Sequence, residues 1–139
     1  MAKHHPYKVK RSKIKTWFNI FNATIFQNDL PEFKKIDFTD HNRHWAQVNG
    51  YPSESDQYDP TKEGPLYCTL SINPYFPTEK LFLDVLFHEM VHYYQWIKYQ
   101  AIGHTKTFYL WKEIAEKHGL VLKSRYIDYS KRPYTPRSV

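Results

Sequence analysis

The sequence predicts an α+β fold in which a small mixed or antiparallel sheet packs on an N-terminal helix and on a second, buried helix. Three observations support this prediction. Apolar residues recur with helical spacing over residues 12–27, and they alternate with strand spacing over residues 66–72. Residues 79–101 form a helix-length segment that is apolar on nearly all sides, as buried helices are.

The first helix is expected over residues 12–27, with Ser12 as its N-cap. Leu30-Pro31 follows it, and the residue before a proline avoids helical backbone angles. The apolar positions of this helix are Ile14, Trp17, Phe18, Phe21 and Ile25.

The strands are expected over residues 32–39, 44–48 and 66–72, and the last has the strongest alternation. Asn49-Gly50 is typical of a hairpin turn and is expected to close the second strand. Residues 51–65 contain three prolines and predict a loop.

The buried helix is expected to begin after Thr78 as N-cap and to end near Gly103, which would take a left-handed conformation. A further helix is expected over residues 105–118 and stops at Gly119. Residues 120–122 are either a short strand or the packed start of a tail.

Charge divides the 139-residue chain into a body and two tails. Residues 1–15 carry six Lys or Arg and no acid, and residues 123–139 carry five Lys or Arg and one acid. We therefore expect a basic N-terminal tail over 1–11, a domain over 12–122, and a basic, aromatic C-terminal tail over 123–139. Such tails suit an anionic partner such as DNA, although solvated chain ends have the same composition.

Other classes of protein are excluded by what the sequence lacks. Cys68 is the only cysteine, which excludes an internal disulfide and a four-cysteine zinc ribbon. No stretch approaches the ~20 apolar residues of a membrane helix, and no signal peptide pattern is present. We expect a cytoplasmic protein with no membrane association.

The expected buried helix carries the motif His88-Glu89-Met90-Val91-His92. The i, i+4 spacing places both imidazoles on one helix face, where they can bind one zinc ion, and Glu89 lies beside them as a general base. Burying two histidines and a glutamate in an otherwise apolar helix is costly unless they are paired or coordinated.

A catalytic zinc takes three protein ligands and keeps one position open. A histidine six residues after the motif is excluded, because Lys98 occupies that position. Glu113 and Glu116 have the spacing of a glutamate ligand. His104, directly after Gly103, is the favoured candidate because a chain that turns at the glycine brings it back toward the metal.

Two further sets of side chains have alternative interpretations. Asp84 lies one turn before His88, where it either orients that imidazole or complements the helix dipole. Tyr93, Tyr94 and Tyr99 are candidates for stabilising an oxyanion, although each also fits a core position.

The segment FLDVLFHEMVHYYQ, followed by GHTKTF, resembles the SprT-like zinc metalloproteases, which include the Spartan proteases that cut proteins crosslinked to DNA. Gly103, His104 and Phe108 match the family's G-H-G-x-x-F-like segment, while Thr105 replaces its second glycine. The resemblance covers about residues 12–122. Upstream it rests on Trp17, Phe18, Asn19, Phe26, Leu30-Pro31 and Leu70-Ser71-Ile72.

The resemblance implies a zincin-like metalloprotease core, with Zn²⁺ held by His88, His92 and His104 and with Glu89 as the catalytic base. The chain would then be a zinc-dependent metalloendopeptidase acting on a protein substrate, in particular DNA-associated proteins. The substrate is expected to lie extended along residues 66–72 as an edge strand. A compact member of this kind suits a phage, in which case it works in the host cytoplasm.

The alternative is a non-catalytic module in which zinc is structural and the tails bind nucleic acid. Glu89 favours the enzyme, because a structural zinc site has no use for a general base.

Overall fold

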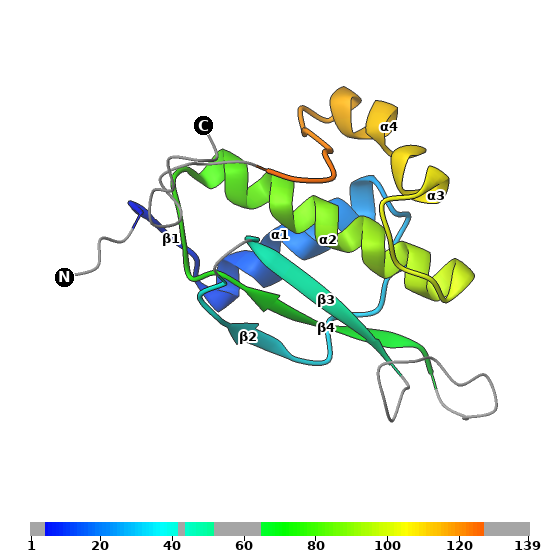
Figure 1. The fold of residues 1–139 in the computed structure, drawn as a ribbon, viewed down its shortest axis with the longest axis horizontal. Helices are drawn as coiled ribbons and strands as arrows, with labels where there is room; N and C mark the ends of the chain where they lie inside the picture. The colour runs from blue at the N-terminus through cyan, green and yellow to red at the C-terminus, as the bar shows by residue number, and fades with distance from the viewer. Residues whose placement is uncertain (1–4, 42–43, 52–64, 127–139) are drawn as a thin grey trace, which may run out of the picture.

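The computed structural model describes residues 5–41, 44–51 and 65–126, and its ribbon is shown in Figure 1. A three-stranded sheet packs against the long helix α2, and helix α1 packs on α2 in turn. The predicted α+β class is therefore confirmed. Within the described ranges, no helix combines the length and apolar character needed to cross a membrane.

Helix α1 spans Arg11–Thr24 and buries Ile14, Phe18 and Phe21. The expectation that Ser12 caps it is wrong, because the chain is already helical at Arg11 and the extended N-cap residue is Lys10. The end of the helix is held by the buried side chain of Asn22. Its amide donates to the Leu30 carbonyl over 2.8 Å and accepts from the Leu30 amide over 3.1 Å.

The sheet has the order β2-β4-β3 and is mixed. Strand β2, Ile36–Phe38, runs parallel to β4, Tyr67–Ile72, while β3, Ala46–Tyr51, is antiparallel to it. Strand β4 is thus paired on both sides. The expectation that residues 66–72 form an edge strand is wrong, and β3 is the edge strand that lies along α2.

Asn49-Gly50 lies inside β3 and not in a turn, which corrects the predicted hairpin. Asn49 pairs with Thr69 and Gly50 with Cys68. The glycine is needed for a close approach, because a Cβ at Gly50 would lie 2.5 Å from ring carbons of Trp96. Residues 52–64 of the predicted loop lie outside the described residues.

Helix α2 spans Glu79–Tyr99 and is buried along most of its length. Thr78 caps it as predicted, accepting from the Leu81 amide over 3.1 Å. The predicted left-handed end at Gly103 is wrong, because Gln100 takes that conformation with φ 52°. The Gln100 side-chain amide donates to the carbonyls of Trp96 and Ile97, and the Trp96 carbonyl also accepts from the Gln100 backbone amide.

The helix predicted over 105–118 is two short helices, α3 at Lys106–Tyr109 and α4 at Lys112–Lys117. Between them the Trp111 amide bonds to the carbonyl of Phe108, three residues back, which tightens and interrupts the helix. Gly119 ends α4 as predicted, with φ 74°.

The described residues near both ends of the predicted domain pack on the body. Strand β1, Tyr7–Lys8, pairs with β5, Tyr75–Phe76, and Val9 is buried. Residues 120–122 do not form a strand but place Leu120 and Leu122 in the core. Residues 1–4 and 127–139 of the predicted tails lie outside the described residues.

Candidate metal centre

Three histidine side chains converge beside helix α2. His88 and His92 lie one turn apart on α2 and are buried, while His104 comes from the segment between α2 and α3 and is exposed. The Nε2 atom of His88 lies 3.1 Å from Nε2 of His92 and 3.3 Å from Nε2 of His104. Sequence spacing placed the first two on one face, and the fold brings the third to them.

Hydrogen bonds on the far side of each ring determine which nitrogen carries the proton. His88 Nδ1 lies 2.8 Å from the Lys123 carbonyl, which can only accept. His92 Nδ1 lies 2.7 Å from Oε1 of Gln95. The Gln95 amide is oriented in turn, since its Nε2 donates to the Gly103 carbonyl over 3.0 Å. Both histidines therefore carry their proton on Nδ1 and a lone pair on Nε2.

The donor set fits a metal ion. Two Nε2 lone pairs, those of His88 and His92, face each other at 3.1 Å, and His104 offers a third donor nearby. This arrangement is repulsive unless a cation lies between the rings. For Zn–N bonds of about 2.0–2.1 Å, a tetrahedral site separates its ligand nitrogens by about 3.3 Å, close to the spacing seen here.

The imidazoles are in the protonation state that binds metals. Burial, together with the neighbouring His92 and His104, lowers the pKa of His88 to about 3. Burial likewise lowers the pKa of His92 to about 4. Both rings are therefore neutral near pH 7, and no proton has to leave before a cation binds.

Glu89 lies next to the histidine cluster, with Oε2 3.9 Å from Nε2 of His88. The side chain is 4% exposed, and burial raises its pKa to about 8. A cation beside the carboxyl group would favour the ionised form, and the carboxylate would then be a base. The position of Glu89 beside the histidine cluster therefore suits a general base.

An open cleft lies beside His88 and Glu89. Its lining comes from the start of β3 and the residues before it, from α2, and from the segment after α4. The lining residues are His44, Trp45, Ala46, Val85, His88, Glu89, Ser124, Arg125 and Tyr126. A molecule in this cleft would contact both Glu89 and the edge strand.

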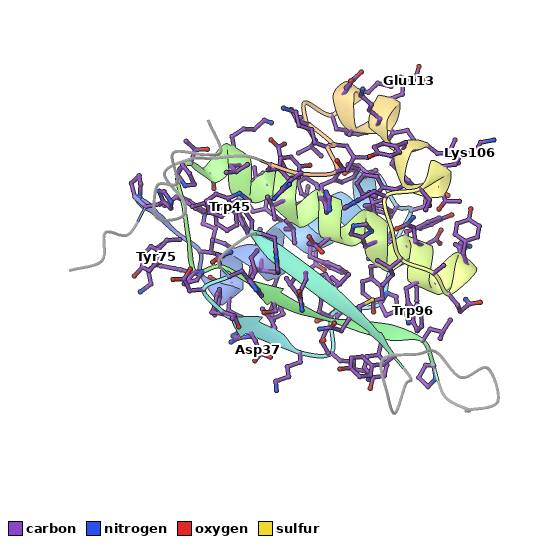
Figure 2. All side chains as sticks on the ribbon, in the orientation of Figure 1. Asp37, Trp45, Tyr75, Trp96, Lys106 and Glu113 are labelled. Atoms are coloured by element: carbon purple, nitrogen blue, oxygen red, sulfur yellow. The ribbon has the colours of Figure 1, made fainter. Side chains whose placement is uncertain are left out.

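The glutamates considered as third ligands are not part of the cluster. Glu113 and Glu116 are exposed on α4 and are not among the side chains that converge with the histidines. Figure 2 shows Glu113 at the outer side of α4, away from α2. Among the candidates that the sequence left open, the fold favours His104.

Asp84 and the candidate tyrosines each have a defined place in the fold. Asp84 accepts from the Val121 amide over 3.0 Å, while the Nδ1 of His88 pairs with Lys123. Tyr93 is buried in the core, as one of its two interpretations predicted, and donates to the Glu32 carbonyl over 3.3 Å, whereas Tyr99 is half exposed at the end of α2. The tyrosine that lines the cleft is Tyr126.

Sequence reasoning missed three groups of this site. Gln95 had a detectable signal, because its i+3 spacing from His92 places it on the same helix face. The Lys123 carbonyl had none, because every residue carries a backbone carbonyl. Tyr126 is one of 12 tyrosines, and nothing local distinguishes it.

A buried helix with the H-E-x-x-H motif, joined by a third histidine at an open cleft, defines a candidate metal centre of the metallopeptidase type. The model of the SprT-like family matches residues 14–128. The chain therefore belongs to the SprT-like family, as its sequence motifs suggested. The match extends beyond residue 122 and includes the segment that lines the cleft. No curated protein and no solved structure matches the chain significantly.

Proposed function

We propose that the protein is a zinc-dependent metalloendopeptidase. The observation that carries this proposal is the convergence of three imidazole nitrogens next to the buried carboxyl group of Glu89, with His88 and Glu89 both lining an open cleft. Membership of the SprT-like family supports it.

Four side chains take part in the proposed hydrolysis. His88, His92 and His104 would hold the zinc, which when bound would supply Lewis-acid activation of a water molecule and of the scissile carbonyl. Glu89 takes the proton of the attacking water and passes it to the leaving amine. Its burial keeps that proton away from bulk solvent during the transfer.

Strand β3 is the place where the substrate chain binds. Asn73 donates its amide to the Trp45 carbonyl, so residues 45, 47, 49 and 51 direct their backbone groups toward β4. The amides and carbonyls of Ala46, Val48 and Gly50 then point to the open side, where the described residues provide no further strand. An extended peptide can add to this edge, and Ala46 also lines the cleft.

DNA-associated proteins are the substrates that the basic ends of the chain favour. Lys123 and Arg125 belong to the described part of the C-terminal basic segment, and Arg125 lines the cleft. DNA binding through these ends should weaken steeply as salt is raised. The test is to delete residues 131–139 and to measure binding to single-stranded DNA at two salt concentrations, with unchanged affinity as the contradicting result.

Glu89→Gln tests the proposed reaction. The variant keeps the size of the side chain and one acceptor oxygen but cannot act as a base. We expect unchanged zinc binding and at least a hundredfold loss in cleavage of an unfolded, fluorescently labelled protein. Glu113→Gln, the same change at an exposed position on α4, is the matched control and should cleave at the wild-type rate.

Two results would contradict the proposal. Cleavage by Glu89→Gln at the wild-type rate would remove the general base from the mechanism. A wild-type protein that binds zinc and single-stranded DNA, but cleaves neither free nor DNA-bound protein, would support the alternative of a zinc-stabilised nucleic-acid-binding module.

A further inference from the structure

We propose that residues 121–126, here called the strap, are a positioning element of the metal centre. In this proposal Tyr126 and Asp84 hold the strap so that the Lys123 carbonyl keeps the proton of His88 on Nδ1. The consequence for zinc affinity rests on the proposed function, while the effect on His88 does not require the metal. Figure 1 shows the strap, in orange, running back along α2 after α4.

The Lys123 carbonyl is the contact between the strap and the metal centre. It lies 2.8 Å from Nδ1 of His88 and comes from a residue 35 positions further along the chain. A neutral imidazole has two tautomers, and only the one protonated on Nδ1 presents a lone pair on Nε2 to a metal. The position of one backbone carbonyl therefore determines whether His88 is ready to bind.

Tyr126 closes the strap on itself. Its hydroxyl donates to the Val121 carbonyl over 2.5 Å and accepts from the Lys123 amide over 3.2 Å. The same oxygen lies 3.4 Å from the carbonyl of Asp84 on α2. One side chain thus holds the backbone just before the Lys123 carbonyl and keeps it against the helix that carries His88.

Asp84 and Trp45 fix the two ends of the strap. The Asp84 carboxylate accepts from the Val121 amide over 3.0 Å and is held by Lys80, whose Nζ lies 2.7 and 2.8 Å from its two oxygens. At the other end, Trp45 Nε1 donates to the Tyr126 carbonyl over 3.1 Å. The strap is therefore tied to α2 and to the residue before β3.

This network explains why a buried acid lies one turn before the motif. Asp84 is 5% exposed, and its carboxylate contacts the strap that orients His88. Partners that fix the far nitrogen of a ligating histidine commonly change metal affinity 10- to 100-fold when they are removed. Since Tyr126 and Asp84 act through Lys123, we expect losses at the lower end of this range.

Tyr126→Phe is the first test, carried out on the full chain. It keeps the ring and removes the hydroxyl that holds Val121 and Lys123. We expect zinc affinity, measured by competition with a coloured chelator, to fall about tenfold. In the metal-free variant, nitrogen-15 NMR of His88 should show a mixture of the two tautomers, where the wild type shows Nδ1–H alone. Tyr99→Phe, at a half-exposed position, is the matched control and should change neither result.

Asp84 provides a second pair of variants. Asp84→Asn keeps an oxygen that accepts from the Val121 amide, whereas Asp84→Ala removes it. We expect Asp84→Ala to lose about as much zinc affinity as Tyr126→Phe and Asp84→Asn to retain most of it. The free energy of unfolding of each metal-free variant is measured alongside, by urea titration.

The possible results distinguish this proposal from the previous one. Wild-type zinc affinity and an unchanged His88 spectrum in Tyr126→Phe would overturn the role of the strap. Equal losses of zinc affinity in Asp84→Asn and Asp84→Ala would overturn the role of the Val121 contact. Unfolding of the metal-free Tyr126→Phe and Asp84→Ala chains would show that the strap has a purely structural role. If the wild type binds no zinc, the proposed function fails, and the tautomer of His88 still decides the positioning role.

Discussion

Replacing Gly50 with alanine should destabilise the protein strongly, because the added methyl group meets the indole of Trp96. A Cβ at this position would lie 2.5 Å from Cδ2 and Cε2 of the ring and 2.9 Å from Cε3. Carbon atoms in contact are separated by about 3.5–4.0 Å. The ring or the strand therefore has to move by about 1 Å.

Neither partner can move freely. Trp96 is 5% exposed on α2, and its Nε1 donates to the Tyr51 carbonyl over 2.7 Å, next to the glycine in the same strand. Figure 2 shows Trp96 where α2 passes the far end of β3. Overpacking costs about 1–3 kcal/mol, and loss of the hydrogen bond adds about 1 kcal/mol. We expect Gly50→Ala to lower the free energy of unfolding by about 2–4 kcal/mol.

Two other glycines provide matched controls. Gly119 has φ 74° and no neighbouring atom within 4 Å, so alanine there meets only backbone strain of about 1 kcal/mol. Gly103 has only Thr105 Cγ2 nearby, at 3.5 Å, so Gly103→Ala should change stability by less than about 0.5 kcal/mol. Urea titration followed by circular dichroism, with chelator present, gives all three values.

The order of the three variants decides between two interpretations of Asn49-Gly50. Packing against Trp96 predicts that Gly50→Ala is clearly the least stable. A hairpin turn would require a left-handed glycine, and Gly50→Ala would then cost no more than Gly119→Ala. That result would refute the packing of β3 on α2 at Gly50 and Trp96, and with it the position of the edge strand beside the cleft.

Four further predictions test the site and the core. His104→Ala should weaken zinc binding tenfold or more, as measured by titration calorimetry, while Glu113→Gln should leave it unchanged. The reverse pattern would place the third ligand on α4. Zinc at 100 times its Kd should raise the free energy of unfolding by about 2.7 kcal/mol, so a chelator should lower the Tm. An unchanged Tm would contradict a metal site that exists only in the folded protein. Cys68 is buried, and burial raises the pKa of its thiol, so a thiol reagent should label it only after denaturation. Rapid labelling of the native protein would contradict its place in the core. Asn22→Ala should lower the free energy of unfolding, measured by urea titration, by about 2–3 kcal/mol, because two buried hydrogen bonds are lost. The control Asn19→Ala, at an exposed position of the same helix, should change it very little. Equal small effects would contradict the role of Asn22.

Features that depend on local spacing could be predicted from the sequence alone. The apolar periodicity of residues 12–27 predicted α1, the helix-length, nearly all-apolar segment 79–101 predicted α2, and alternation predicted β4 to within one residue. The i, i+4 spacing placed His88 and His92 on one helix face. Thr78 and Gly119 were predictable as helix boundaries, because a cap or a left-handed residue depends on its immediate neighbours.

Which strand is central, why residue 50 is a glycine, and what lies around the metal centre became clear from long-range packing alone. A strand's alternation is the same in the middle of a sheet and at its edge, and a glycine has the same sequence signal whether it turns the chain or admits a tryptophan. His104 joins His88 through the path of a loop, and the Lys123 carbonyl reaches His88 across 35 residues. Contacts of this kind depend on backbone groups and on long-range packing, which carry no local pattern in the sequence.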